Sequence, residues 1–378
     1  GFNALLKLPY LKNIPQLSYL GFNRPSTSVL GVDISSRAVK LVQLELQGQG
    51  YHVTAAGAEA LPLGALRDGM VVNEAAVSKV LKHVYDTSGA TSKDAAIAVS
   101  GSSVLSKIVE LPARMNQKQL AARIQLAASE SIPLPLEEIY LDYAVLGYNP
   151  SDQAQMRVKM VACPRDHVNS RGKIIERANL RSIAVDIESY ALVRCYQKLS
   201  ASSVPDQSMQ SDYSPSEALN VLIDVGANSF TFAVFKSDLV IYTSEYSLGK
   251  SSLADKHISP RKSVKKENNK ALYSKILLSD YDDIELKAFI GLLLQYTNRS
   301  IADFYAANAS AKIQKLIFSG GMFQIEGLAE KLDEEIDIPT EVFNSNDHLT
   351  ETHTGQVSLL SQNHSMTVAL GLALRSHY

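Results

Sequence analysis

The sequence lacks several features that would assign a protein class at once. It has two cysteines in 378 residues, Cys163 and Cys195, and no metal-ligand spacing surrounds either of them. They give no disulfide framework and indicate buried thiols, so we predict a protein of a reducing, cytoplasmic compartment. The eight histidines are scattered along the chain. Even the nearest useful pair, His348 and His353, makes a poor metal site.

Strong charge and long apolar runs are missing as well. The net charge of -2 argues against the basic surface of a nucleic-acid-binding protein. No apolar run is long enough to cross a bilayer, and no basic-then-apolar signal segment opens the chain. Hydrophobic residues make up 46% and charged residues 20%, which is typical of globular proteins. A chain of 378 residues exceeds one ordinary core, so we expect two or three domains or subdomains.

Shifts in hydrophobic period and composition divide the chain. We predict an N-terminal leader at 1–28, a first core at 29–93 and 181–198, an α+β insert at 94–180, a linker at 199–218, and a second core at 219–378 with a variable segment at 245–285. Leucines and aromatic residues are frequent in the leader, and its three prolines prevent a long helix, which indicates a flexible tail or a segment that binds a partner or a membrane surface.

The stretch "VLGVDISSRAVKLVQLE", residues 29–45, predicts a strand, a tight turn and a second strand. Its echo is "LIDVGANSFTFAVF", which aligns Asp33 with Asp224, Ser35 with Gly226, and Lys40 with Thr231. A repeat this far apart indicates two related halves rather than a solenoid.

Two such turns facing each other predict a nucleotide site. Each turn offers backbone N–H groups to an anion, and side-chain donors come from Ser35, Ser36, Asn228 and Ser229. Asp33 and Asp224 repel phosphate, so they fit only if a hydrated Mg²⁺ lies between them and the phosphates. The "SGG" at 319–321 leaves room for a flat ring near a helix N-terminus.

The order of these segments resembles the superfamily of actin, the sugar kinases and the heat-shock chaperone ATPases. There, a phosphate loop, a connecting helix, a second phosphate loop, an adenosine loop and a second connecting helix follow one another. The matching residues here are 31–44, 183–196, 221–235, 316–332 and 367–375. The resemblance implies an α/β, actin-like (ribonuclease-H-like) duplicated two-domain fold. The insert at 94–180 lies where the cell-division protein FtsA carries its extra subdomain.

Within that superfamily, residues 29–378 most closely resemble the PilM family of type IV pilus assembly proteins. The likeness is carried by "GVDISSRAVKLVQL", "VDIESYAL", "LIDVGANSFTF", "LIFSGGMFQIEGLAEKL" and "ALGLALRS". It implies a cytoplasmic scaffold for pilus assembly and twitching motility that binds ATP with weak or absent hydrolysis. It also implies binding of the cytoplasmic tail of the inner-membrane protein PilN. Through PilN the scaffold would be peripheral to the inner membrane and linked indirectly to the motor ATPases; self-association stays open.

Carried over from the family, the site roles fall into three groups. Asp33 and Asp224 would serve Mg²⁺ through water. The phosphates would be held by Ser35, Ser36, Lys40, Gly226, Asn228 and Ser229. The adenosine would lie against Gly320, Gly321 and Met322.

The sequence departs from the family in three places. Segment 245–285 lacks the usual "FGG"-type stretch that contributes to the nucleotide wall, Ser35 stands where glycine is common, and the leader is longer. The leader's "FNALLKLP" loosely mimics the Asn-Leu-Leu-Pro core of PilN tails, so the leader could instead occupy the PilN groove.

The groove is less explicit in the sequence. In the family it lies between the first core and the insert, so we expect helix 116–131 and strand 140–148 as its walls. Its candidate residues are Leu120, Arg123, Ile124 and Tyr143. Leu120, Ile124 and Tyr143 could instead pack in the hydrophobic core of the insert itself.

An enzyme is the main alternative. An actin-fold ATPase or small-molecule kinase needs a carboxylate base near the reacting oxygen, and Asp186 and Glu188 are the candidates. For Asp186, a helix cap or a water-positioning group is the structural alternative. A filament protein like FtsA is a third hypothesis. Such proteins carry an amphipathic membrane anchor at the C-terminus, and no amphipathic segment follows "LRSHY" in this sequence, which argues against it.

Overall fold

The computed structural model describes residues 28–48, 50–67, 69–149, 151–201, 218–226, 228–237, 239–248, 283–351 and 366–377. Most of the predicted leader, linker and variable segment lies outside the described residues.

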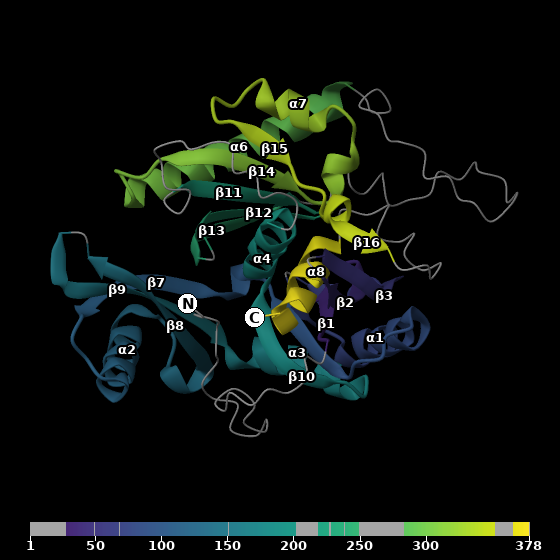
Figure 1. Ribbon diagram of the computed structural model, residues 1–378, viewed down its shortest axis with the longest axis horizontal. Helices are drawn as coiled ribbons and strands as arrows, with labels where there is room; N and C mark the ends of the chain where they lie inside the picture. The colour runs from purple at the N-terminus through teal and green to yellow at the C-terminus, as the bar shows by residue number, and fades with distance from the viewer. Residues whose placement is uncertain are drawn as a thin grey trace, which may run out of the picture.

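The first lobe is built on a sheet with the strand order β10-β6-β1-β2-β3-β16 (Figure 1). Its strands are β1 (Leu30–Ile34), β2 (Ala38–Gln47), β3 (Gly50–Ala60), β6 (Asp94–Val99), β10 (Arg181–Ile187) and β16 (Leu349–Glu351). Helices α1 (Glu74–Ser88) and α3 (Arg165–Arg177) pack beside it, and a short hairpin joins β4 (Leu66–Arg67) to β5 (Met70–Val71). Asn73 is the N-cap of α1, and Gly89 ends it in the left-handed conformation.

The second lobe repeats this arrangement in the order β13-β12-β11-β14-β15. Its strands are β11 (Leu219–Val225), β12 (Ser229–Lys236), β13 (Leu239–Ser247), β14 (Ile313–Ser319) and β15 (Thr340–Val342). Two helices accompany it, α6 (Asp283–Ala307) and α7 (Leu328–Asp333). In both lobes the Asp-bearing strand lies between its hairpin partner and a parallel strand, as expected of two related halves.

The insert is a sheet of order β7-β9-β8 with one helix against it. Its elements are β7 (Leu105–Pro112), α2 (Gln117–Ser131), β8 (Ile139–Asn149) and β9 (Asp152–Pro164). The helix expected at 116–131 is confirmed as α2, which begins at a reciprocal capping box of Asn116 and Gln119.

The predicted segment boundaries need two corrections. Strand β6 was assigned to the insert, but it pairs in parallel with β1 and β10 in the first sheet. Strand β16 and helix α8 (Thr367–Ala373) were assigned to the second core, but both contact the first sheet. Hydrophobic period alone does not reveal which distant strand a parallel strand will pair with. The remaining boundaries stay predictions.

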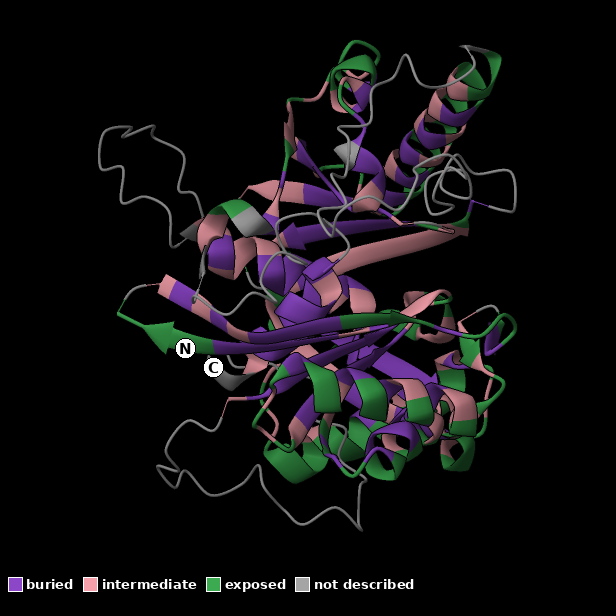
Figure 2. Ribbon diagram, turned by 90° about the vertical axis from the view of Figure 1, so that its right-hand side faces the viewer, coloured by how far each residue is buried: buried purple, intermediate pink, exposed green. Residues whose placement is uncertain are grey.

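The two lobes meet where α4 (Glu188–Ala201) crosses α8, a contact we call the hinge. A Cβ atom added to Gly371 would lie 1.9 Å from the Ala191 carbonyl oxygen, so only glycine permits this approach. The Arg194 guanidinium donates to the Gly371 carbonyl at 2.9 Å. Figure 2 shows buried residues concentrated along the strands and at this crossing. No helix in the described part of the chain is long and apolar enough to span a membrane.

Candidate functional site

The two hairpins present their aspartates at equivalent register positions. Asp33 at the end of β1 lies opposite Lys40, and Asp224 near the end of β11 lies opposite Thr231. The alignment predicted from sequence is therefore confirmed, residue for residue. Asp33 is buried, and its Oδ2 lies 3.5 Å from the Lys40 Nζ. The first hairpin thus carries a charge pair, whereas the second places a hydroxyl residue beside its carboxylate.

The predicted donors divide into turn-formers and open groups. The Ser35 hydroxyl accepts from the Ala38 N–H at 3.2 Å and donates to the Ala38 carbonyl at 3.1 Å, so it closes its own turn. Ser36 and Ser229 are exposed at the two turns. The Asn228 Oδ1 is buried without a hydrogen-bond partner in the described structure; it is an acceptor, so only the amide nitrogen of Asn228 could donate to a phosphate.

Carboxylates gather between the lobes. Burial raises the pKa of Glu188 at the start of α4 to about 8, and nearby Glu245 and Asp33 add to the increase while Arg171 opposes it. Burial also raises the pKa of Asp224 to about 6, against the effects of Ser319 and Lys40. These carboxylates influence one another between the lobes. In the part of the chain that the structure describes, no group of three or more His, Cys, Asp or Glu side chains could hold a metal ion directly, so a cation here would have to be held through water.

A buried arginine lies beneath this acidic centre. Arg171 of α3 donates to the Ile34 carbonyl at 3.4 Å and to the Gly69 carbonyl at 3.0 Å. Burial lowers its pKa, and the charges of Glu188 and Asp33 oppose that effect. Arg171 therefore fixes the end of β1 and partly balances the carboxylates.

The third predicted loop follows β14. Gly320 has a φ of 102°, and an added Cβ would lie 2.4 Å from the Val225 carbonyl oxygen. This loop therefore needs glycine to lie against β11. Gly321 borders open space and begins the 3₁₀ turn η5 (Gly321–Gln324). Met322 is a correction: its side chain is 3% exposed and packs in the core of the second lobe, so it is not available to an adenosine ring.

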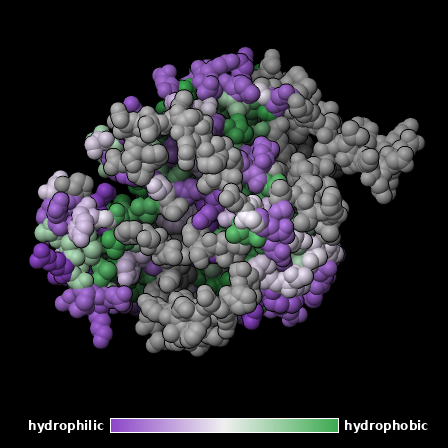
Figure 3. Space-filling view, in the orientation of Figure 1, coloured by the Kyte–Doolittle hydropathy of each residue, from purple (hydrophilic) through white to green (hydrophobic). Residues whose placement is uncertain are grey.

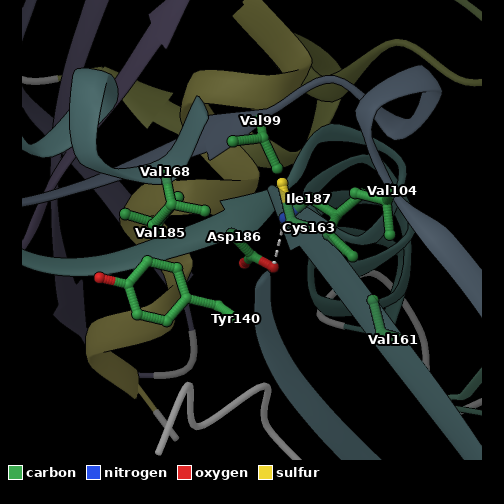
Figure 4. Close-up of a pocket in the computed structure, with 9 residues that line it drawn as sticks. All are labelled: Val99, Val104, Tyr140, Val161, Cys163, Val168, Val185, Asp186 and Ile187. Carbon is green, nitrogen blue, oxygen red and sulfur yellow. Dashed lines mark hydrogen bonds between the residues drawn. The ribbon is translucent and has the colours of Figure 1, made fainter. Parts of the chain in front are cut away.

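Asp186 is a second correction. Its Oδ2 lies 2.7 Å from Arg194 and 2.5 Å from Arg375, and its Oδ1 accepts from the Ile187 N–H. Burial alone would raise the pKa of Asp186, but the two arginines bring it down to about 2. Asp186 therefore holds the hinge in charge balance and is not a catalytic base. Figure 4 shows it at the edge of a small apolar pocket that Tyr140 and Cys163 also line.

The predicted partner-groove residues separate by burial. Ile124 is 2% exposed inside the insert's own core, so its assignment to a groove is wrong. Leu120 and Tyr143 are partly buried against the same core, and Arg123 is exposed on α2. Hydrophobic side chains nevertheless gather on the inner side of the insert, at the left of Figure 3.

Sequence reasoning missed two residues of this centre and ranked a third too low. Glu245 and Arg171 were not singled out, and Glu188 stood beside Asp186 as an equal candidate. Glu245 lies opposite Thr231, which in turn lies opposite Asp224, so one row crosses the second sheet. A glutamate inside the alternating strand "LVIYTSEYS" was the available indication.

Comparison with known proteins agrees with this architecture. A model of the family described as type IV pilus assembly protein PilM matches residues 31–377. The chain is similar to a solved PilM–PilN type IV pilus biogenesis complex, with a TM-score of 0.71 and 20% identity over 94% of this chain and 100% of that chain. It also resembles EutJ, an ethanolamine utilization protein from Carboxydothermus hydrogenoformans, with a TM-score of 0.46 and 11% identity over 93% and 91% of the two chains. For MreB 5 of Spiroplasma citri bound to AMPPNP, the TM-score is 0.42 and the identity 10%, over 92% and 95%.

The family match covers almost the whole described chain, and the similarity to the PilM–PilN structure shows the shared fold. The predicted α/β, actin-like duplicated fold is thus confirmed. The chain belongs to the PilM family of type IV pilus assembly proteins.

Proposed function

We propose that this protein is a nucleotide-binding scaffold of the type IV pilus machine, with ATP and Mg²⁺ held between its two lobes. The observation that carries the proposal is the pair Asp33 and Asp224, placed at equivalent positions of duplicated hairpins. The charge of Asp33 contributes to raising the pKa of Asp224, which supports a shared site for the two carboxylates.

The residues of the cleft fit a magnesium nucleotide. Bound Mg²⁺ would supply positive charge between the carboxylates and the phosphates. Asp33 and Asp224 would hold it through water, and Lys40 would lie on the phosphate side of Asp33. The unpartnered Asn228 Oδ1 offers one more polar contact. Gly320 and Gly321 would let the adenosine lie close to the backbone.

The partner would be the cytoplasmic tail of PilN. A solved structure similar to this chain is a PilM–PilN complex, which supports the proposal that the tail binds in a groove with the insert as one wall. Leu120, Tyr143 and exposed Arg123 remain proposed contacts on that insert. Through PilN the protein would be peripheral to the inner membrane on its cytoplasmic side. It would link that membrane platform to the motor ATPases.

The test is a titration of the purified protein with a fluorescent PilN-tail peptide, with and without Mg-ATP. We expect saturable binding near micromolar, about -8 kcal/mol, and a change in affinity when Mg-ATP is present, because coupling between two ligands is reciprocal. Absence of peptide binding in both conditions would contradict the scaffold function, although the family assignment would stand.

A second candidate function, ATP hydrolysis, is favoured by Glu188 alone. Its carboxyl lies near Asp33 and Asp224, where a base would act on a water molecule. A pKa of about 8 leaves it mostly protonated at neutral pH, so any hydrolysis would be weak and would increase as pH rises to about 8. Steady-state ATPase rates of wild type and Glu188→Gln between pH 6 and 9 test this candidate function. We expect a rate that rises with pH in wild type and is lost in the variant. A rate that is equal in both proteins would remove this candidate.

A further inference from the structure

Glu245 of β13 crosses from the second lobe to the first. Its carboxylate accepts hydrogen bonds from the Ser100 hydroxyl, the Gly101 N–H and the Ser102 N–H, each at 2.9 Å. The acceptor residue and its donors are separated by more than 140 positions in sequence. Two adjacent backbone N–H groups and a hydroxyl around one carboxylate form an anion cradle. The cradle belongs to the turn η1 (Gly101–Ser103), directly after β6.

The cradle has a structural counterpart in the second lobe. Strand β6 lies parallel to β1 as β14 lies parallel to β11, and each is followed by a 3₁₀ turn that begins at a glycine. The turn η1 is therefore the first lobe's counterpart of η5. Gly321 of η5 borders open space, whereas a Cβ on Gly101 would lie 2.2 Å from the Glu245 Oε1. The protein's own carboxylate fills one of the two equivalent turns.

A second contact holds the same strand. The buried Lys159 of β9 donates to the Val240 carbonyl at 2.7 Å, and its Nζ lies 5.1 Å from the centre of the Tyr190 ring. Strand β13 is the edge of the second sheet. It is thus attached to η1 near one end and to the insert near the other. Glu245 also shares a lateral row with Thr231 and Asp224, so the attachment lies next to the proposed Mg²⁺ position.

We propose that Glu245 and the η1 cradle form an inter-lobe clasp that keeps the cleft closed and limits the release of nucleotide. This inference rests on the proposed function and adds its regulation. When the clasp opens, the carboxylate leaves the Gly101 and Ser102 amides, and the lobes separate about the hinge between α4 and α8. The clasp then restricts the exchange of nucleotide without touching the phosphates.

The test compares wild type with Glu245→Ala and Glu245→Gln. The matched control is Glu59→Ala, because Glu59 is an exposed carboxylate on β3, the first-lobe counterpart of β13. Spin labels at Lys79→Cys and Glu335→Cys, both exposed, report the distance between the lobes, while native Cys163 and Cys195 are buried. Hydrogen exchange at the Gly101 and Ser102 amides reports the cradle itself.

We expect Glu245→Ala to lengthen and broaden the inter-lobe distances and to speed exchange at both amides about tenfold. The glutamine variant keeps the size of the side chain with one acceptor oxygen, so we expect an intermediate effect. It also keeps the test decisive if the alanine variant does not fold. Distances and exchange rates that match wild type in the glutamine variant and any folded alanine variant would overturn the clasp.

Nucleotide kinetics separate this inference from the function on which it rests. We expect a fluorescent ATP analogue to dissociate from Glu245→Ala about tenfold faster than from wild type. If wild type binds no nucleotide while the distances still change, the clasp stands and the proposed function fails. If nucleotide binds but distances, exchange and dissociation are all unchanged, the clasp fails and the proposed function stands.

Discussion

The two lobes share a backbone plan but differ in charge. In each, an antiparallel meander of three strands continues through two parallel strands, and an aspartate stands near the end of the first strand. In the first lobe Lys40 stands beside Asp33, and the turn η1 after β6 is filled by Glu245. In the second lobe Asp224 lies opposite Thr231, and the equivalent turn borders open space at Gly321.

This difference shows what the duplication preserved. Backbone turns and the two aspartates repeat, which fits the proposed cation between the two halves with one carboxylate from each. The residues opposite the aspartates, Lys40 and Thr231, differ between the lobes. The positive charge of Lys40 acts on both carboxylates, so the second lobe needs no lysine of its own. The lobes are therefore symmetric in fold and unequal in electrostatics.

The largest expected loss of stability comes from a position where one lobe has glycine and the other has a large side chain. Gly31 stands two residues before Asp33, where the second lobe has Leu222 before Asp224. A Cβ on Gly31 would lie 1.8 Å from the Ala369 carbonyl oxygen of α8. We expect Gly31→Val to lower the free energy of unfolding by about 4 kcal/mol or more, and Leu222→Ala by about 2–4 kcal/mol.

Urea unfolding followed by circular dichroism measures both variants. A Gly31→Val protein as stable as wild type would mean that α8 does not lie against β1 in solution.

The next effect concerns the buried hinge carboxylate. Asp186→Asn leaves Arg194 and Arg375 without their counter-charge, so we expect a loss of about 3–5 kcal/mol in unfolding free energy. Asp86→Asn is the control, because Asp86 pairs with Lys82 on the exposed face of α1 and should change stability by less than about 1 kcal/mol. Equal small losses in the two variants, measured by urea unfolding, would remove Asp186 from the hinge.

The pH dependence of stability distinguishes the two sides of the cleft. Folding raises the pKa of Asp224 from 3.8 to about 6 and that of Glu188 from 4.5 to about 8. Each group therefore favours the folded state below its unfolded pKa, and that stability is lost as pH rises through the folded pKa. At about 1.4 kcal/mol per pKa unit, these shifts correspond to losses on the order of 3 kcal/mol for Asp224 and 5 kcal/mol for Glu188 between pH 4 and 8.

Unfolding free energies of Asp224→Asn and Glu188→Gln across this range provide the check. The first variant should reduce the fall between pH 4 and 6, to which Glu188 also contributes, and the second should remove the part that continues from pH 6 to 8. A wild-type profile that is flat or rises over pH 4–8 would contradict the account of both carboxylates.

The smallest effect tests whether Lys40 acts on both aspartates. Lys40→Met removes the ammonium that lies beside Asp33 and that also lowers the pKa of Asp224. The loss of stability that accompanies ionisation of Asp224 should therefore move above pH 6. We expect a stability loss of about 1–2 kcal/mol. Thr231→Val should cost less than about 1 kcal/mol and leave the transition in place. Identical pH profiles for the two variants would show that Lys40 influences only its own hairpin.

The local elements could be predicted from sequence because their causes are local. Alternating apolar residues identify β1 and β2, and Asn116 identifies the start of α2. Contacts between distant residues could not be predicted, since no spacing connects Gly101 to Glu245 or Asp186 to Arg375. The same limit explains why β6 was assigned to the insert and Met322 to the nucleotide site. The equivalence of the glycine turns η1 and η5 follows from the order of strands in the two sheets, which the sequence does not show.

The central claim is that both hairpins hold one magnesium nucleotide. Isothermal titration of ATP into wild type, Asp33→Asn and Asp224→Asn, each with Mg²⁺ and with EDTA, tests it most directly. The account predicts Mg²⁺-dependent binding to wild type and loss of that dependence in both variants. Binding that is the same with EDTA, or that needs only one of the two aspartates, would contradict it.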